Sequence, residues 1–199
     1  CEGLTTYLAD HLIKEQRGQG QEYRRTTVQK FTDYVTPEND FPLTEFKSRY
    51  NAPSEAIGYG KSLMLFNMLR CKVGDTQFVK ALQEFYRRHK FTAATFNDIQ
   101  QIFEEVSNED LEQFFRQWTQ RTGAPDLQLK DVAVRTKDND YILSFSLKQQ
   151  QKADPFILDI PLAVTFADSV VIKEVTMSAA EQSWKFRFPD QPLLLQIDP

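Results

Sequence analysis

The sequence predicts an α+β protein made of two units that follow one another along the chain. Apolar residues recur at helical spacing up to about residue 122, and from about residue 127 they alternate with polar residues as in half-buried strands. Gly123 and Pro125 lie at this change, in the order in which glycine and proline end a helix. We therefore expect a helical domain over residues 1–123 and a β domain over residues 126–199.

Length and composition fit a globular protein of this kind. The 199 residues are 41% hydrophobic and 26% charged, and the formal net charge is -4. No run of Lys and Arg occurs, so the sequence gives little support to nucleic-acid binding. No apolar run approaches the ~18 residues of a membrane span. Because the chain starts at Cys1 rather than at methionine, we expect it to be a fragment of a longer protein; its oligomeric state is left open.

The cysteines and histidines do not predict a metal site within this chain. Cys1 and Cys71 are too few for a disulfide framework, and Cys71 is expected to be a buried thiol because its segment is strongly apolar. His11 and His89 fall on separate predicted helices, without a second histidine or cysteine at metal-ligand spacing.

The first helix is predicted over residues 2–17. Glu2 lies in its first turn, where the helix dipole favours a negative charge, so the pattern alone makes Glu2 a local electrostatic feature. A second helix is expected over residues 21–35, and residues 43–55 are predicted to be irregular and interrupted by Pro53. The residues expected to face inward are Leu4, Tyr7, Leu8, His11 and Leu12 on the first helix, and Tyr23, Thr27, Phe31 and Tyr34 on the second.

Further helices follow as far as Gly123. Residues 63–69 are apolar nearly all round, which predicts a helix buried on most sides. Thr95 and Asp98 have the spacing of a capping box at the start of another helix. The expected inward faces are Phe78, Val79, Leu82, Phe85, Tyr86 and His89; then Ile99, Ile102, Phe103 and Val106; then Leu111, Phe114, Phe115 and Trp118.

The last third of the chain predicts a small Ig-like β-sandwich without the Cys/Trp/Cys signature of antibody domains. A turn is expected at Asp138-Asn139-Asp140. The predicted strands are 127–134, 141–147, 156–166, 170–177, 183–188 and 193–197.

Two motifs resemble the aminopeptidase N family of zinc metallopeptidases, the gluzincins. Glu2-Gly3-Leu4-Thr5-Thr6-Tyr7-Leu8 is similar to the segment that carries the third zinc ligand, and Tyr59-Gly60-Lys61-Ser62 is similar to the family's Tyr-x-Lys-Gly, with Ser62 in place of glycine. Weaker matches follow in the family's order: Gly74 to Phe78, Tyr86 to His89, Thr95 to Asp98, Asp110 to Trp118, and Gly123 to Pro125.

The resemblance implies that residues 1–123 are the α-helical lobe of a thermolysin-like catalytic domain, followed by a β-sandwich. It implies that Glu2 is a zinc ligand beside two histidines of a His-Glu-x-x-His helix, which is not in this sequence. It also implies that Tyr59 donates its phenol proton to the oxyanion of the tetrahedral intermediate. The implied cofactor is Zn²⁺ in the full-length parent, with a peptide as substrate, and none is expected in this fragment alone. Lys61 receives no role.

Three functions remain open from the sequence. The first is a fragment of a zinc metallopeptidase, an aminopeptidase that hydrolyses N-terminal peptide bonds and is inactive without the missing helix. The second is an aminopeptidase-like scaffold or protein-interaction module that has lost the zinc site. The third takes the sandwich as an adhesion or carbohydrate-binding module. For Tyr59 itself, the alternative is a buried tyrosine with a satisfied hydroxyl.

Overall fold

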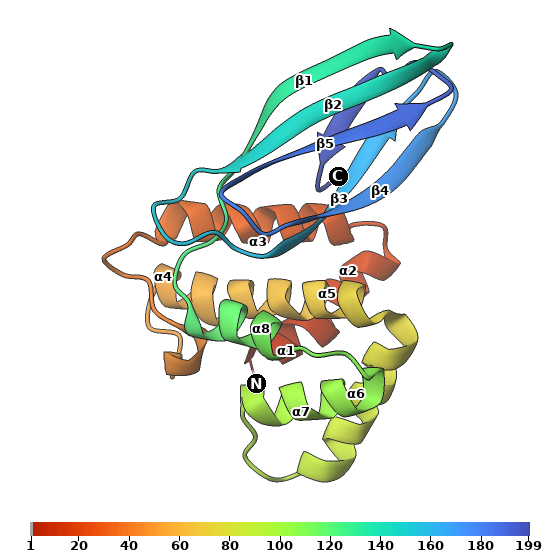
Figure 1. The fold of residues 1–199 in the computed structure, drawn as a ribbon. Coiled ribbons are helices and arrows are strands. Elements are labelled where there is room, and N and C mark those ends of the chain that lie inside the picture. Colours follow the sequence, from red (N-terminus) through yellow and green to blue (C-terminus); the bar gives the residue numbers. More distant parts are fainter. Residues whose placement is uncertain (1) are drawn as a thin grey trace. The chain divides into compact units, whose positions relative to one another are not determined.

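The computed structural model describes residues 2–199, which divide into two compact units between Gly123 and Ala124 (Figure 1). The first unit is helical and the second contains two antiparallel sheets, which confirms the α+β fold class. None of the helices in the described part of the chain is both long and apolar enough to cross a membrane.

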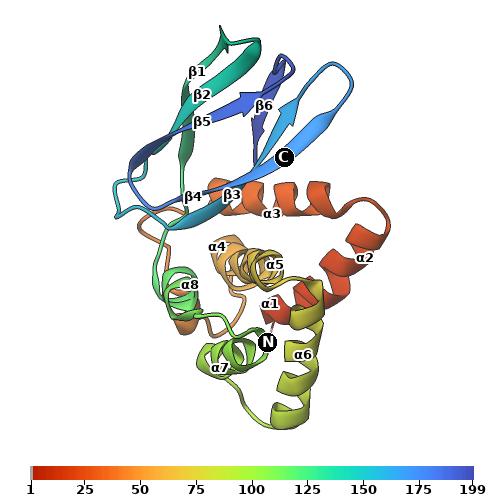
Figure 2. The same cartoon turned by 45° about the vertical axis from the view of Figure 1, so that its right-hand side comes forward.

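The helical unit includes three helices that change between α and π winding along their length. Figure 2 shows α4 and α5 nearly end on, with α1, α3, α6, α7 and α8 around them. The segments are α1 (Glu2–Thr5), π-helix η1 (Thr6–His11), α2 (Leu12–Gln16), α3 (Gly20–Tyr34), 3₁₀ helix η2 (Leu43–Glu45), α4 (Ala52–Glu55), π-helix η3 (Ala56–Lys61), α5 (Ser62–Val73), α6 (Asp75–His89), α7 (Phe96–Ser107), α8 (Glu112–Phe115) and π-helix η4 (Arg116–Gln120).

The core of this unit surrounds α5, as its apolar sequence predicts. Leu63, Leu65, Phe66 and Leu69 are all buried. Aromatic contacts extend the core outward, because Tyr7 meets Phe78 edge-on at 5.7 Å between ring centroids, and Phe78 meets Phe103 at 5.5 Å. The capping box that starts α7 is formed by Thr95 and Asp98, as predicted.

Several predicted inward faces are wrong in part. In the first helix the buried residues are Gly3, Tyr7 and His11, whereas Leu8 is 39% exposed. These three buried residues are four apart and share one face, and Leu8 follows Tyr7 directly, so it lies on a neighbouring face. On α3 the predicted inward residue Tyr34 is exposed.

On α6 the buried positions are Phe78 and Ala81, while Val79 is 52% and Tyr86 is 67% exposed. Val79 follows Phe78 directly, and adjacent helical positions do not share a face. Cys71 is exposed, not buried as predicted, because it lies in the last turn of α5, beyond that helix's buried stretch.

Residues 43–55 are more regular than predicted. Pro53 does not interrupt this segment but lies in the first turn of α4, where its missing N–H costs nothing. Asn51 caps the helix by accepting from the Ser54 backbone N–H at 3.0 Å, and the Ser54 hydroxyl accepts from the Asn51 N–H at the same distance.

The second unit consists of two three-stranded antiparallel sheets that form two layers, with strand orders β1-β2-β5 and β4-β3-β6 (Figure 1). At the β1–β2 hairpin, Asp138 and Asn139 have positive φ values of 50° and 64°, as a type I′ turn requires. The Phe166 and Phe188 rings, 5.1 Å apart, join the two sheets. The strands are β1 (Leu127–Lys137), β2 (Asp140–Gln149), β3 (Leu158–Thr165), β4 (Val170–Met177), β5 (Glu181–Phe188) and β6 (Leu194–Ile197).

Candidate functional site

Glu2 lies exposed in the first turn of α1, directly before a buried glycine. Gly3 packs against Ser62 at the start of α5, and a Cβ atom on Gly3 would lie 1.9 Å from the Ser62 Cβ. Because no Cβ contacts are that short, only glycine at position 3 lets the two helices approach this closely. The glycine after Glu2 therefore fixes where the Glu2 carboxylate lies relative to α5.

Tyr59 lies on the π-helix η3, half-buried, and its phenol lies near enough to the Glu2 carboxylate for the two groups to interact electrostatically. The structure thus brings together the two site residues named from the sequence, although they are distant along the chain. The pKa of Tyr59 is raised, first by desolvation and then by the interaction with the negative charge of Glu2. The phenol is therefore a neutral hydrogen-bond donor near pH 7.

The ring of Tyr59 is held by Phe46, whose ring meets it edge-on with centroids 6.0 Å apart. Phe46 can lie there because Gly58 has no side chain: a Cβ at Gly58 would lie 2.1 Å from the Phe46 ring. The glycine directly before Tyr59 therefore makes room for the aromatic contact that orients the phenol.

Arg49 is a further charged residue beside Tyr59. Its guanidinium carbon lies 5.9 Å from the centre of the Tyr59 ring, a cation–π distance, and its Nη1 atom lies 3.5 Å from a Glu55 carboxylate oxygen. Its charge opposes the rise in the pKa of Tyr59. Sequence reasoning missed both Phe46 and Arg49, because their segment has no helical or strand periodicity that would assign them a direction.

Lys61, the other residue kept from the motif, does not join Glu2 and Tyr59. Its ammonium group is buried and donates to the carbonyl oxygens of Arg121, at 2.7 Å, and Gly123, at 3.3 Å. Ser62, which stands where the family has glycine, donates its hydroxyl to the Gly58 carbonyl at 2.8 Å. The serine therefore satisfies a backbone acceptor within the turn that carries Tyr59.

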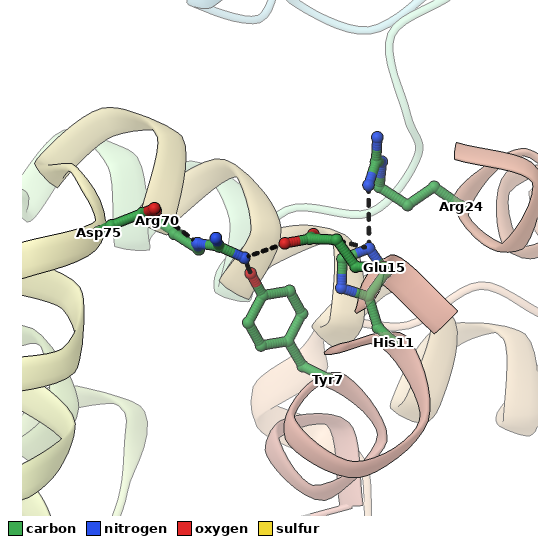
Figure 3. Close-up of polar contacts among 6 residues, drawn as sticks. All are labelled: Tyr7, His11, Glu15, Arg24, Arg70 and Asp75. Carbon is green, nitrogen blue, oxygen red and sulfur yellow. Dashed lines mark hydrogen bonds and ion pairs between the residues drawn. The ribbon is translucent and has the colours of Figure 1, made fainter. Parts of the chain in front are cut away.

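Farther along the first helix lies a separate polar cluster (Figure 3). Arg70 Nη1 donates to Glu15 at 2.8 Å and to the Tyr7 hydroxyl at 3.4 Å, and Arg70 Nε donates to Asp75 at 2.7 Å. These bonds hold α5 against the first helix and the start of α6. The buried Tyr7 has a raised pKa because of desolvation, so it stays protonated.

His11, in the same cluster, is fully buried and stacks on Tyr7 with ring centroids 4.9 Å apart. Its Nε2 atom lies 2.9 Å from an Arg24 nitrogen. A guanidinium can only donate, so Nε2 must accept and the imidazole must carry its proton on Nδ1. Desolvation, together with the nearby Arg24 charge, lowers the pKa of His11. His11 is therefore a neutral structural histidine.

The Glu2 carboxylate fits the chemistry of one zinc ligand, because it is exposed, negatively charged and an oxygen donor. Residues 2–199 contain no group of three or more His, Cys, Asp and Glu side chains placed to hold a metal ion. In His11, Nε2 is engaged by Arg24 rather than directed to Glu2.

Comparisons with known proteins agree with this architecture. Residues 1–118 match the Peptidase family M1 domain. The chain is 31% identical over 114 residues to Aminopeptidase N of Escherichia coli strain K12, covering 56% of this chain and 13% of that protein. It is also 31% identical over 126 residues to Aminopeptidase N of Haemophilus influenzae, covering 62% of this chain and 14% of that protein.

A similar solved structure is that of Legionella pneumophila aminopeptidase A in complex with aspartic acid, with a TM-score of 0.55 and 19% identity. The likeness covers 96% of this chain and 22% of that one, and at this identity it supports the fold alone. The family match covers more than half of the chain and includes the segments of both Glu2 and Tyr59. The chain belongs to peptidase family M1.

Proposed function

We propose that this chain forms part of a zinc aminopeptidase, to which it contributes Glu2 as a metal ligand and Tyr59 as the oxyanion donor. The observation that carries the proposal is the proximity of the Tyr59 phenol to the Glu2 carboxylate, whose charge raises the pKa of that phenol. It places a neutral phenol donor beside a carboxylate suited to zinc, on two helices that Gly3 and Ser62 hold in close contact.

When bound, zinc would supply a Lewis acid that polarises the scissile carbonyl and lowers the pKa of a water molecule. Glu2 would hold the metal through a carboxylate oxygen, and the two histidine ligands would come from sequence that this chain does not contain. The proposed role of Tyr59 follows from its phenol, which is a neutral hydrogen-bond donor. Its phenol can donate to the negative oxygen that develops in the transition state, where one such donor typically contributes ~2.7–4 kcal/mol.

The proposed substrate is a peptide with a free amino terminus. This class rests on the family and on the aminopeptidase names of the relatives, not on a pocket in this chain. The chain spans only 13% and 14% of the two bacterial relatives, so the groups that bind the substrate's amine are proposed to lie elsewhere.

The test compares the isolated chain with the full-length protein that contains it. After dialysis, we expect the isolated chain to hold no stoichiometric zinc, because it supplies one of the three protein ligands that a catalytic site needs. The full-length protein should hold one zinc and release the N-terminal residue of an aminoacyl substrate. A chelator should abolish that activity, and added zinc should restore it.

One tightly bound zinc per isolated chain would contradict the ligand assignment. A full-length protein that folds but neither binds zinc nor cleaves the substrate would be a scaffold, and the proposed function would then be wrong.

A further inference from the structure

The Tyr-x-Lys-Gly motif contains a buried lysine whose contacts lie away from Glu2. The Lys61 side chain is 8% exposed, and its ammonium donates to the carbonyls of Arg121 and Gly123. Burial lowers the pKa of Lys61, and the charge of Asp40 opposes that shift. The Asp40 carboxylate also accepts from the backbone N–H of Gly123. The segment after η4 is thus tied down by two side chains of opposite charge.

Burying an ammonium group is costly unless hydrogen bonds replace its lost water. An apolar side chain of similar length could fill this site without that cost. An apolar side chain would not fix its end at one point, because packing alone does not specify a position. The lysine ammonium does, because its hydrogen bonds to two carbonyls are directional. The buried lysine therefore fixes the position of its turn relative to the two carbonyls.

Lys61 is the last residue of the π turn η3, and Tyr59 lies two residues before it in the same turn. Side chains two apart on a helix do not face each other, so the two leave the turn in different directions. Tyr59 reaches Glu2 and Phe46, whereas Lys61 reaches the Arg121–Gly123 segment. A fixed lysine end thus limits rotation of the turn about its axis.

The winding of this turn makes such an anchor useful. A π turn is rare and local, and it recurs at functional sites, where a different winding would redirect the side chains it carries. Phe46 fixes the plane of the Tyr59 ring and packs on Gly58, but it does so from the segment shortly before α4, so it does not tie η3 to a distant part of the chain. The two hydrogen bonds from the Lys61 ammonium tie η3 to the Arg121–Gly123 segment, which is distant in sequence.

We propose that Lys61 is a positioning residue for Tyr59: by binding the Arg121 and Gly123 carbonyls, it holds the π turn so that the phenol points at the reacting carbonyl. The proposal rests on the proposed function of Tyr59. Lys61 itself does not touch Glu2 and acts only through the turn.

The test uses the full-length enzyme with Lys61→Met, which keeps an unbranched chain as long as the lysine stem and removes the ammonium. A displaced donor of about 1 Å can cost on the order of 100-fold in rate. We therefore expect kcat to fall roughly 10- to 100-fold, with KM changed less than about threefold and zinc content unchanged. Lys61→Arg keeps the charge and the donors but alters the reach, so it should fold and show a smaller fall in kcat, again without a change in KM.

A double-mutant cycle with Tyr59→Phe separates positioning from general destabilisation. If Lys61 acts through the Tyr59 hydroxyl, adding Lys61→Met to Tyr59→Phe should lower kcat no further. The matched control is Ile102→Ala, which removes buried volume on α7. At a temperature where it is folded, it should keep wild-type kcat and should add independently to Tyr59→Phe.

The outcomes distinguish the two proposals. Tyr59→Phe with wild-type kcat would overturn the proposed function. If Tyr59→Phe has a lowered kcat but the folded single mutant Lys61→Met or Lys61→Arg keeps wild-type kcat, only the positioning role would be overturned. Losses that multiply in the double mutant would also overturn it, because they would show that Lys61 acts independently of the phenol.

Discussion

The Tyr59 phenol lies beside the Glu2 carboxylate, which brings a residue of the π turn η3 together with one from the first turn of α1. The contact depends on two glycines. Gly3 lets the first helix approach Ser62, and Gly58 makes room for the Phe46 ring that orients the phenol. A carboxylate and a neutral phenol are thereby placed together by backbone packing, which makes their geometry sensitive to changes outside the pair.

The role of Glu2 as a ligand predicts a loss of metal. In the full-length protein, Glu2→Ala should lower zinc affinity by more than ~100-fold, since changing even the residues behind a ligand typically costs 10–100-fold. Zinc content after dialysis against a buffered chelator measures this. The control is Glu22→Ala, an exposed glutamate on α3 that pairs with Arg25. Full zinc content in Glu2→Ala would mean that the carboxylate is only a helix-start charge.

The close contact of Gly3 and Ser62 predicts a compensating pair of substitutions. Gly3→Ala should destabilise the chain by ~1–3 kcal/mol, because the new methyl group meets the Ser62 Cβ. Ser62→Gly removes that atom, so the double mutant should be more stable than Gly3→Ala alone. Ser62→Gly alone should lose stability, because it removes the hydroxyl bond to Gly58 and places a glycine in a helix. Urea unfolding measures all four proteins; equal stability of Gly3→Ala and wild type would refute the close contact.

The buried His11 predicts that stability falls at mildly acidic pH. Its pKa is lowered in the folded state by desolvation and by Arg24, so below the unfolded value of about 6.5 the unfolded chain binds more protons. The contribution is fully present above pH ~6.5 and is lost as pH falls toward the folded pKa. The other charged groups near the ring are Glu15, which opposes the shift, and Arg70, which adds to it.

The matched variant is His11→Gln, whose amide oxygen can still accept from Arg24 but does not titrate. Urea unfolding between pH 5 and 8 should show a steeper loss of stability in the wild type than in His11→Gln. Equal slopes in the two proteins would show that His11 does not resist protonation in the folded state.

The features that the sequence predicts well are local ones, which depend on residues close together along the chain. The capping box of Thr95 and Asp98 is local, and so is the two-residue turn at Asp138 and Asn139. Strand alternation is followed only in part: β5 alternates over most of its length, whereas the half-buried residues of β1 fall at every third position across a register shift. The buried faces of helices are predicted less well, since spacing does not say which of two neighbouring faces is covered: Leu8 is exposed although its spacing from Leu4 and Leu12 is helical.

The candidate site was predictable only through the resemblance. Periodicity makes Glu2 a helix-start charge and gives Tyr59 no partner, and the contact between them is tertiary. The positions of Arg49 and Phe46 beside Tyr59, and of Lys61 against Arg121, depend on how distant segments pack. No local pattern encodes such contacts, so their residues could be named from the motif but not given roles.

The most direct test of the account is kcat of Tyr59→Phe in the full-length protein with its zinc content measured on the same sample. The substitution keeps the ring and its contact with Phe46 and deletes only the hydroxyl. We expect unchanged zinc, nearly unchanged KM and a fall in kcat of roughly 100- to 1,000-fold, as for the loss of one oxyanion donor. Wild-type kcat with full zinc would contradict the account and leave Tyr59 as a packing residue.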